Sequence, residues 1–110
     1  MIEIEIIRKG DRIISLTSKG HAGYADYGQD IVCAGTSAII FGLFNAIDMI
    51  DNTIPMGINR EENKCFLTNT TNNEIINNYL DCAFVQLKSI GIKYPKFIRI
   101  TERRTQWNLC

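Results

Sequence analysis

The chain has 110 residues, 45% of them hydrophobic and 22% charged, and its 12 basic residues balance its 12 acidic ones. This length predicts one domain, residues 1–110, and the balanced charge and high apolar content argue against a general nucleic-acid binder and a disordered chain. Asn45 and Asp48 interrupt the longest apolar stretch, residues 31–50, which makes it a poor membrane span. The start of the chain lacks the basic residues of a secretion signal. We therefore expect a cytoplasmic protein with neither a membrane nor a nucleic acid as a direct partner.

The first thirty residues predict a hairpin followed by a long loop. Residues 2–7 alternate isoleucine with glutamate and residues 12–17 are β-rich, with Lys9-Gly10-Asp11 as the turn between them. Residues 19–29 contain glycines and tyrosines but no aliphatic side chain larger than alanine. A loop of this length in a small domain tends to be functional.

From Asp30 to about Ile50 the hydrophobic period becomes helical. Asp30 is a good N-cap residue for this helix, and Cys33 then lies in its first turn.

The second half predicts another hairpin, a second helix and a last strand. Residues 56–59 and 64–69 form the hairpin, and residues 71–74 (TNNE) are a capping-box pattern that opens the helix. Gly91 is expected to close that helix, residues 96–101 to form the last strand, and residues 102–110 to form a polar tail. The order ββαββαβ predicts a single α+β domain, a mixed and mostly antiparallel sheet covered by two main helices.

The cysteines and the single histidine limit the possible chemistry. The four cysteines, Cys33, Cys65, Cys82 and Cys110, form no C-x-x-C pair, which argues against a zinc knuckle or a redox dithiol. We predict that they are reduced, that Cys65, Cys82 and Cys110 are structural, and that no metal or cofactor is bound. His21 is the only histidine, so any imidazole chemistry depends on it.

The segment of residues 20–37 joins this histidine to the helix-start cysteine. A helix N-terminus stabilises a thiolate, and a nearby imidazole can pair with it and then protonate a leaving amine. The free N–H groups of the helix start could hold the oxyanion of an acyl-transfer intermediate. Ser37 lies four residues after Cys33 and shares its face of the helix.

Each of these residues also has a plain structural interpretation. Cys33 can be a small packing residue, and His21 a solvated surface group. Asp30 can be a simple N-cap, and Ser37 a packing hydroxyl.

Two short runs in this segment resemble a known family signature. Residues 20–22 read GHA and residues 30–37 read DIVCAGTS, separated by a short glycine-containing loop. This pattern, together with the chain length and the two-helix layout, resembles the ribosomal-processing cysteine proteases, the Prp family.

The resemblance implies roles for several residues. His21 matches the family's catalytic histidine and Cys33 its nucleophile, and Asp30 and Ser37 match its supporting acidic and hydroxyl residues. Family members act as homodimers and remove a short N-terminal extension from a large-subunit ribosomal protein, number twenty-seven. The loop of residues 22–29 is then expected to be mobile and to order around the peptide.

The leading hypothesis is therefore a cytosolic cysteine endopeptidase whose substrate is a ribosomal protein precursor. One alternative is a non-catalytic ribosome-associated protein that grips a peptide with the same loop, and another is a thiol-redox protein. Tyr24 and Tyr27 either line a peptide groove or anchor the loop. The residues predicted to contact substrate are Gly20, Ala22, Gly23, Tyr24, Tyr27 and Phe41.

Overall fold

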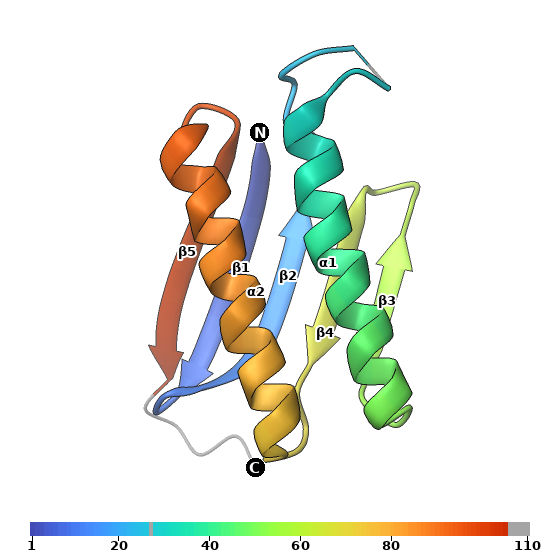
Figure 1. Ribbon diagram of the computed structural model, residues 1–110, viewed down its shortest axis with the longest axis vertical. Helices are drawn as coiled ribbons and strands as arrows, with labels where there is room; N and C mark the ends of the chain where they lie inside the picture. The colour runs from blue at the N-terminus through green and yellow to red at the C-terminus, as the bar shows by residue number, and fades with distance from the viewer. Residues whose placement is uncertain (27, 106–110) are drawn as a thin grey trace.

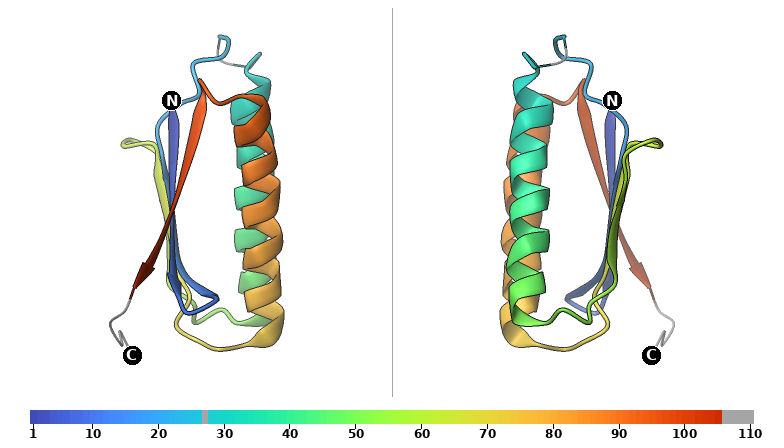
Figure 2. Two further views of the ribbon diagram at one scale, coloured as in Figure 1. Left: turned by 90° about the vertical axis from the view of Figure 1, so that its left-hand side faces the viewer. Right: turned by 90° about the vertical axis from the view of Figure 1, so that its right-hand side faces the viewer.

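A five-stranded sheet carries both helices on one face, and no described helix or strand covers its other face (Figures 1 and 2). This computed structural model describes residues 1–26 and 28–105. The elements are β1 (Ile2–Lys9), β2 (Arg12–Lys19), α1 (Ile31–Ile50), β3 (Met56–Asn59), β4 (Lys64–Thr68), α2 (Glu74–Lys93) and β5 (Ile98–Thr105). The predicted α+β class and the order ββαββαβ are confirmed.

The sheet is mixed and mostly antiparallel, as expected. Its strands are arranged β3-β4-β2-β1-β5, and only the β1–β5 pair is parallel. A parallel pair requires a crossover connection, and the chain between β1 and β5 includes both helices. As a result the start of β1, the end of β2, the start of β5 and the C-terminal end of α2 all lie at one end of the molecule (Figure 1). The loop before α1 lies at this same end.

Alternation in β1 sends its isoleucines into the core. Ile2, Ile4 and Ile6 are buried against the helix layer, and the glutamates between them face the open side of the sheet. The predicted turn forms around Gly10, whose φ of +61° suits glycine.

Helix α1 buries one stripe on the sheet and leaves much of its surface apolar. Its buried residues recur at three- to four-residue spacing: Val32, Thr36, Ile40, Leu43, Phe44 and Ile47. Within the described part of the chain, α1 is the one helix that is long and apolar enough to cross a membrane by length and composition. Here its buried stripe packs in the core of the α+β domain.

The boundaries of α2 differ from the prediction at both ends. Asn73, rather than Thr71, is the N-cap, because its side chain accepts the backbone N–H groups of Ile75 and Ile76. Gly91 does not end the helix, which continues to Lys93 and is capped by Tyr94.

Close packing and the following strand account for the other differences at this end. A Cβ at Gly91 would lie 3.3 Å from Ile100 Cδ1, so this glycine permits close approach to β5. Strand β5 extends to Thr105, four residues beyond its predicted end. The rest of the predicted tail, including Cys110, lies outside the described residues.

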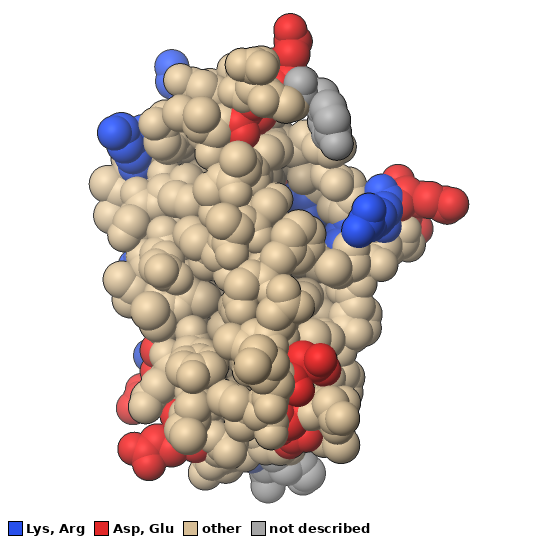
Figure 3. Space-filling view, turned by 45° about the vertical axis from the view of Figure 1, so that its right-hand side comes forward, with Lys and Arg blue, Asp and Glu red and all other residues tan. Residues whose placement is uncertain are grey.

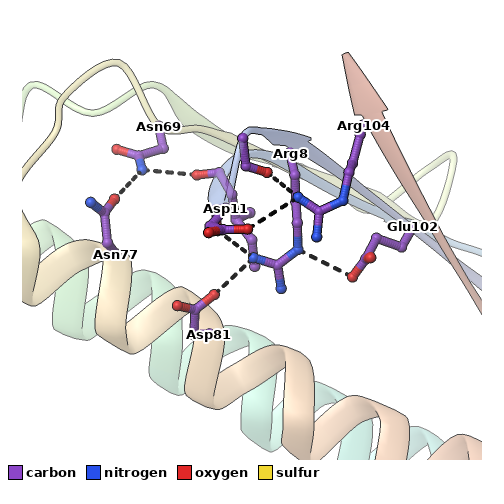
Figure 4. A network of polar contacts seen from close by, with 9 residues as sticks. Arg8, Asp11, Asn69, Asn77, Asp81, Glu102 and Arg104 are labelled. Atoms are coloured by element: carbon purple, nitrogen blue, oxygen red, sulfur yellow. Dashed lines mark hydrogen bonds and ion pairs between the residues drawn. The ribbon is translucent and has the colours of Figure 1, made fainter. Parts of the chain in front are cut away.

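Near the end of β1, a buried arginine joins α2 to the sheet (Figure 4). Arg8, 9% exposed, contacts Asp81 of α2 and Glu102 of β5, each at 3.1 Å, and donates to the carbonyl of Asp11 at 2.6 Å. Its guanidinium also lies 5.0 Å from the centre of the Phe84 ring. This cluster fixes the hairpin, α2 and β5 relative to one another.

Replacing Arg8 by Met is expected to lower the free energy of unfolding by about 1–3 kcal/mol, because Asp81 and Glu102 lose their buried partner. Arg99→Met is the matched control. Arg99 pairs with Glu3, but its side chain is 62% exposed, so we expect a loss of ~0.5 kcal/mol or less. Urea denaturation measures both changes, and equal losses would contradict a special role for the buried guanidinium.

Candidate active site

The N-terminus of α1 is organised by the carboxylate of Asp30. Its Oδ1 accepts the backbone N–H groups of Val32 at 3.0 Å and Cys33 at 2.9 Å, which is the geometry of an N-cap. Asp30 therefore caps the helix, as predicted, and fixes the backbone of Cys33.

The second oxygen of the same carboxylate holds the preceding loop. Asp30 Oδ2 accepts the N–H of Tyr24 at 3.0 Å and that of Ala25 at 3.5 Å. Partial desolvation raises the pKa of Asp30, but the hydrogen bonds from Cys33, Tyr24, Ala25 and Val32 outweigh it and lower this pKa below its ordinary value. The charged form is therefore the one that joins the loop to the helix.

The loop returns to the cysteine through a backbone amide. The N–H of Ala22 donates to Cys33 Sγ at 3.2 Å. The Ala22 side chain is buried, whereas Cys33 is half-buried. The peptide bond between His21 and Ala22 thus lies against the sulfur. The His21 side chain itself is exposed.

Ser37 and Phe41 follow Cys33 along α1 at four-residue intervals, so the three residues lie on one flank of the helix. Ser37 is half-buried and Phe41 is 44% exposed. Gly35 lies on the opposite flank, where an added Cβ would meet Ile90 of α2 at 3.5 Å. The flank with Cys33 therefore faces away from α2.

Tyr24 lies on an aromatic support at the end of α2. Its ring meets that of Tyr94 edge-on at 5.6 Å between centroids and that of Phe97 at 5.2 Å. The support is itself fixed, because the Phe97 carbonyl accepts the N–H of Ile2 at 2.9 Å and the Phe97 N–H donates to the Tyr94 carbonyl at 3.0 Å. These contacts match the loop-anchor interpretation of Tyr24. Tyr27 lies outside the described residues.

Gly20 anchors the other end of the loop. Its N–H donates to the Asn63 carbonyl at 3.1 Å, and its carbonyl accepts from the Asn63 side chain at 2.6 Å. Gly20 has a φ of +94°, and a Cβ there would lie 2.4 Å from the Met1 carbonyl oxygen. No other residue fits here without displacing backbone. Gly23, with a φ of +69°, has open space around it.

One expectation for the helix start is wrong. We expected its amides to be free for an oxyanion, but those of Val32 and Cys33 donate to the Asp30 carboxylate, and that of Ala34 donates to the Asp30 carbonyl at 3.0 Å. Capping by Asp30 and donation of these amides to an oxyanion compete for the same hydrogens.

The remaining described cysteines, Cys65 and Cys82, are free thiols, as is Cys33. Cys65 lies half-buried in β4, where burial raises the pKa of its thiol, partly offset by hydrogen bonding with Ser18. Cys82 is exposed on α2. Among residues 1–26 and 28–105, no group of three or more His, Cys, Asp or Glu side chains is placed to hold a metal ion.

Sequence reasoning did not find Asn63, Tyr94 and Phe97. They hold the loop in place but lie more than forty positions along the chain from the loop residues that they contact. The β3–β4 turn and the aromatic pair lie at the end of the sheet where β2 finishes. This arrangement is known only once the strand order is known.

The fold is a small α+β domain, and its candidate site places a thiol, Cys33, in the first turn of a helix. Residues 1–99 match the family described as cysteine protease Prp, and the chain belongs to that family. The ribosomal processing cysteine protease Prp of Staphylococcus aureus is 34% identical over 107 residues, covering 94% of this chain and all of the relative. The Mycoplasma pneumoniae protein of the same name is 35% identical over 94 residues, covering 81% of this chain and 87% of its own.

Solved structures of a member of this family have a similar fold over nearly the whole chain. The S. aureus protease with a covalently linked product peptide matches at a TM-score of 0.86 and 30% identity, over 93% of this chain and 99% of that one. The same protease with a substrate peptide matches at a TM-score of 0.81 and 28% identity, with the same coverage.

Two replacements of Asp30 separate its two roles. Asp30→Ala removes both and should lower the free energy of unfolding by about 1 kcal/mol. Asp30→Asn keeps an oxygen for the helix cap but places an amide where Oδ2 holds the loop. We expect Asn to retain most of the stability while the Tyr24 amide exchanges hydrogen faster in both variants. Unchanged exchange in both would contradict the tether.

The pH dependence of the Asp30 variants follows from the lowered pKa. A carboxylate whose pKa is lowered by folding contributes stability at neutral pH and loses it as the pH falls through that value. Asp30→Asn should therefore lose less stability between neutral and acid pH than the wild-type protein, as measured by urea denaturation at each pH.

Proposed function

We propose that this chain is the cytosolic endopeptidase that removes the N-terminal extension of a large-subunit ribosomal protein precursor, number twenty-seven. Membership of the ribosomal processing protease family supports the proposal, as do the substrate and product peptides bound by the S. aureus relative. The observation that carries it is the Ala22 N–H on Cys33 Sγ, because it brings the His21–Ala22 peptide to the candidate nucleophile.

In the proposed reaction, Cys33 Sγ attacks the scissile carbonyl carbon, and its proton passes to the imidazole of His21. The new C–S bond forms as the carbonyl π electrons move to oxygen. The tetrahedral intermediate then breaks its C–N bond, and His21 gives its proton to the leaving amine. Water hydrolyses the resulting thioester and frees the sulfur. Asp30 acts as a positioning residue, because it touches the loop and the helix rather than the reacting atoms.

The flank of α1 that carries Cys33 is the natural path for the peptide. Ser37 and the exposed ring of Phe41 continue from Cys33 along it, away from α2. The Tyr24 ring packs on Tyr94 and Phe97 at the C-terminal end of α2, and it therefore leaves this flank of α1 accessible. An apolar side chain of the extension would contact Phe41.

A ribosome-associated protein that only binds peptide remains the alternative function. It would use the same loop, but it would not need a loop amide directed at a sulfur atom. Cleavage of the precursor separates the two.

Incubation with the precursor, followed by mass spectrometry of the product N-terminus, tests the proposal. Cys33→Ala should lower the cleavage rate by about 10⁴-fold or more and His21→Ala by about 10²–10⁴-fold. Cys65→Ala removes a half-buried thiol outside the site and should leave the rate close to that of the wild type. Full activity of either site variant, or an inactive wild-type protein, would contradict the assignment.

We also propose that two copies associate through the helix layer. A groove of about 430 Å³ runs between α1 and α2, lined by small and aromatic residues that include Ala38, Gly42, Ala46 and Tyr79. In the space-filling view, charged side chains lie along the margins of the visible face (Figure 3). A groove of this composition suits an apolar partner surface, and the helix layer of a second copy offers one.

A charge placed in this groove should separate the copies. A Cβ at Gly42 would meet nothing within 4 Å, so the Gly42→Glu variant should fold. Analytical sedimentation of this variant should give the mass of a monomer. Asn52→Glu adds the same charge in the exposed turn after α1 and should sediment as the wild type does. A wild-type protein that is monomeric at micromolar concentration would rule out this association.

A further inference from the structure

The reaction proposed above needs a hydrogen-bond donor for the oxyanion, and the helix start does not supply it. The amides of Val32, Cys33 and Ala34 are all bonded to Asp30. To use them for substrate would break the helix cap and release the charged form of Asp30 from its partners. A donor from another backbone segment beside the sulfur would leave this cap intact.

Ala22 supplies such a donor. Its N–H is directed at Cys33 Sγ from 3.2 Å. When a carbonyl carbon bonds to that sulfur, the carbonyl oxygen lies two bonds from Sγ, within the range of a group that already reaches the sulfur. An N–H that donates to the free sulfur can thus transfer to the oxyanion with little movement.

Contacts on both sides of Ala22 position this amide at the start of the loop. Two residues before Ala22, Gly20 is fixed by Asn63, and two residues after it, Tyr24 is fixed by Asp30. The Ala22 methyl group is itself buried, at 4% exposure. Electrostatic stabilisation of a transition state depends on donors that need no reorganisation at the moment of reaction.

Resting on the proposed function, we propose that the backbone N–H of Ala22 is the oxyanion donor of this protease. As Cys33 Sγ bonds to the substrate carbonyl carbon and the thiol proton passes to His21, negative charge develops on the carbonyl oxygen. The Ala22 N–H moves from the sulfur to this oxygen. It returns to the sulfur once the thioester has been hydrolysed.

The donor is a backbone group, so the test replaces the amide and keeps the side chain. In a protein assembled by chemical ligation, lactic acid at position 22 converts the Ala22 N–H to an ester oxygen and retains the methyl group. We expect kcat/KM for precursor cleavage to fall by about 10²-fold or more. Lactic acid at position 25 makes the same chemical change in the same loop, where the N–H is the distant 3.5 Å donor to Asp30. We expect it to change kcat/KM by about twofold or less.

A second measurement separates the oxyanion from the sulfur. Alkylation of Cys33 by iodoacetamide passes through no oxyanion, so loss of the Ala22 N–H can affect it only through the free sulfur. We expect the alkylation rate to change by about tenfold or less, well below the effect on cleavage. If cleavage falls no more than alkylation, or does not fall, the Ala22 N–H is not the oxyanion donor. Failure of the unmodified protein to cleave the precursor would instead contradict the proposed function.

Discussion

The carboxylate of Asp30 joins the two halves of the candidate active site. One oxygen caps the helix that carries Cys33, and the other holds the loop that carries His21 and Ala22. A neutral residue of the same size could cap the helix, but it could not accept from both sides at once. Because the same group contacts both segments, the position of the loop amide relative to the sulfur depends on this local constraint. Asp30 therefore contributes to the geometry of both segments.

The sheet topology supplies the other supports of the loop. The parallel pairing of β1 with β5 brings Phe97 beside Ile2, and the crossover through α2 brings Tyr94 to the same place. Tyr24 then packs on both rings. The β3–β4 turn contributes Asn63 from the other side. A loop with few apolar side chains of its own is thus positioned by residues from two distant parts of the chain.

The sequence predicted most of the fold because its elements carry strong local signals. The alternation in β1, the turn at Gly10 and the cap at Asp30 each depend on neighbouring residues, and all three are confirmed. Gly91 misled the prediction because it serves contact with Ile100, a tertiary requirement that resembles a helix stop in the sequence.

The candidate site was predictable in its components but not in its contacts. His21 and Cys33 are conspicuous by residue type, and the helix start is visible from its cap. Side-chain geometry decides which backbone N–H groups donate to Asp30 and which stay available to a substrate. The spacing of residues in the sequence does not determine this geometry. The Ala22 amide has no side-chain signature, so only the structure could single it out.

The buried guanidinium of Arg8 and the loop at Asp30 lie at opposite ends of the molecule (Figure 1). Between Asp81, which Arg8 contacts, and the end of α2 at Lys93 the helix runs for about 18 Å. Substitutions so far apart usually act additively. The hairpin end is therefore a place where compensating changes can restore stability lost to an altered loop, so that the loop of the candidate site can change while the rest of the scaffold stays constant.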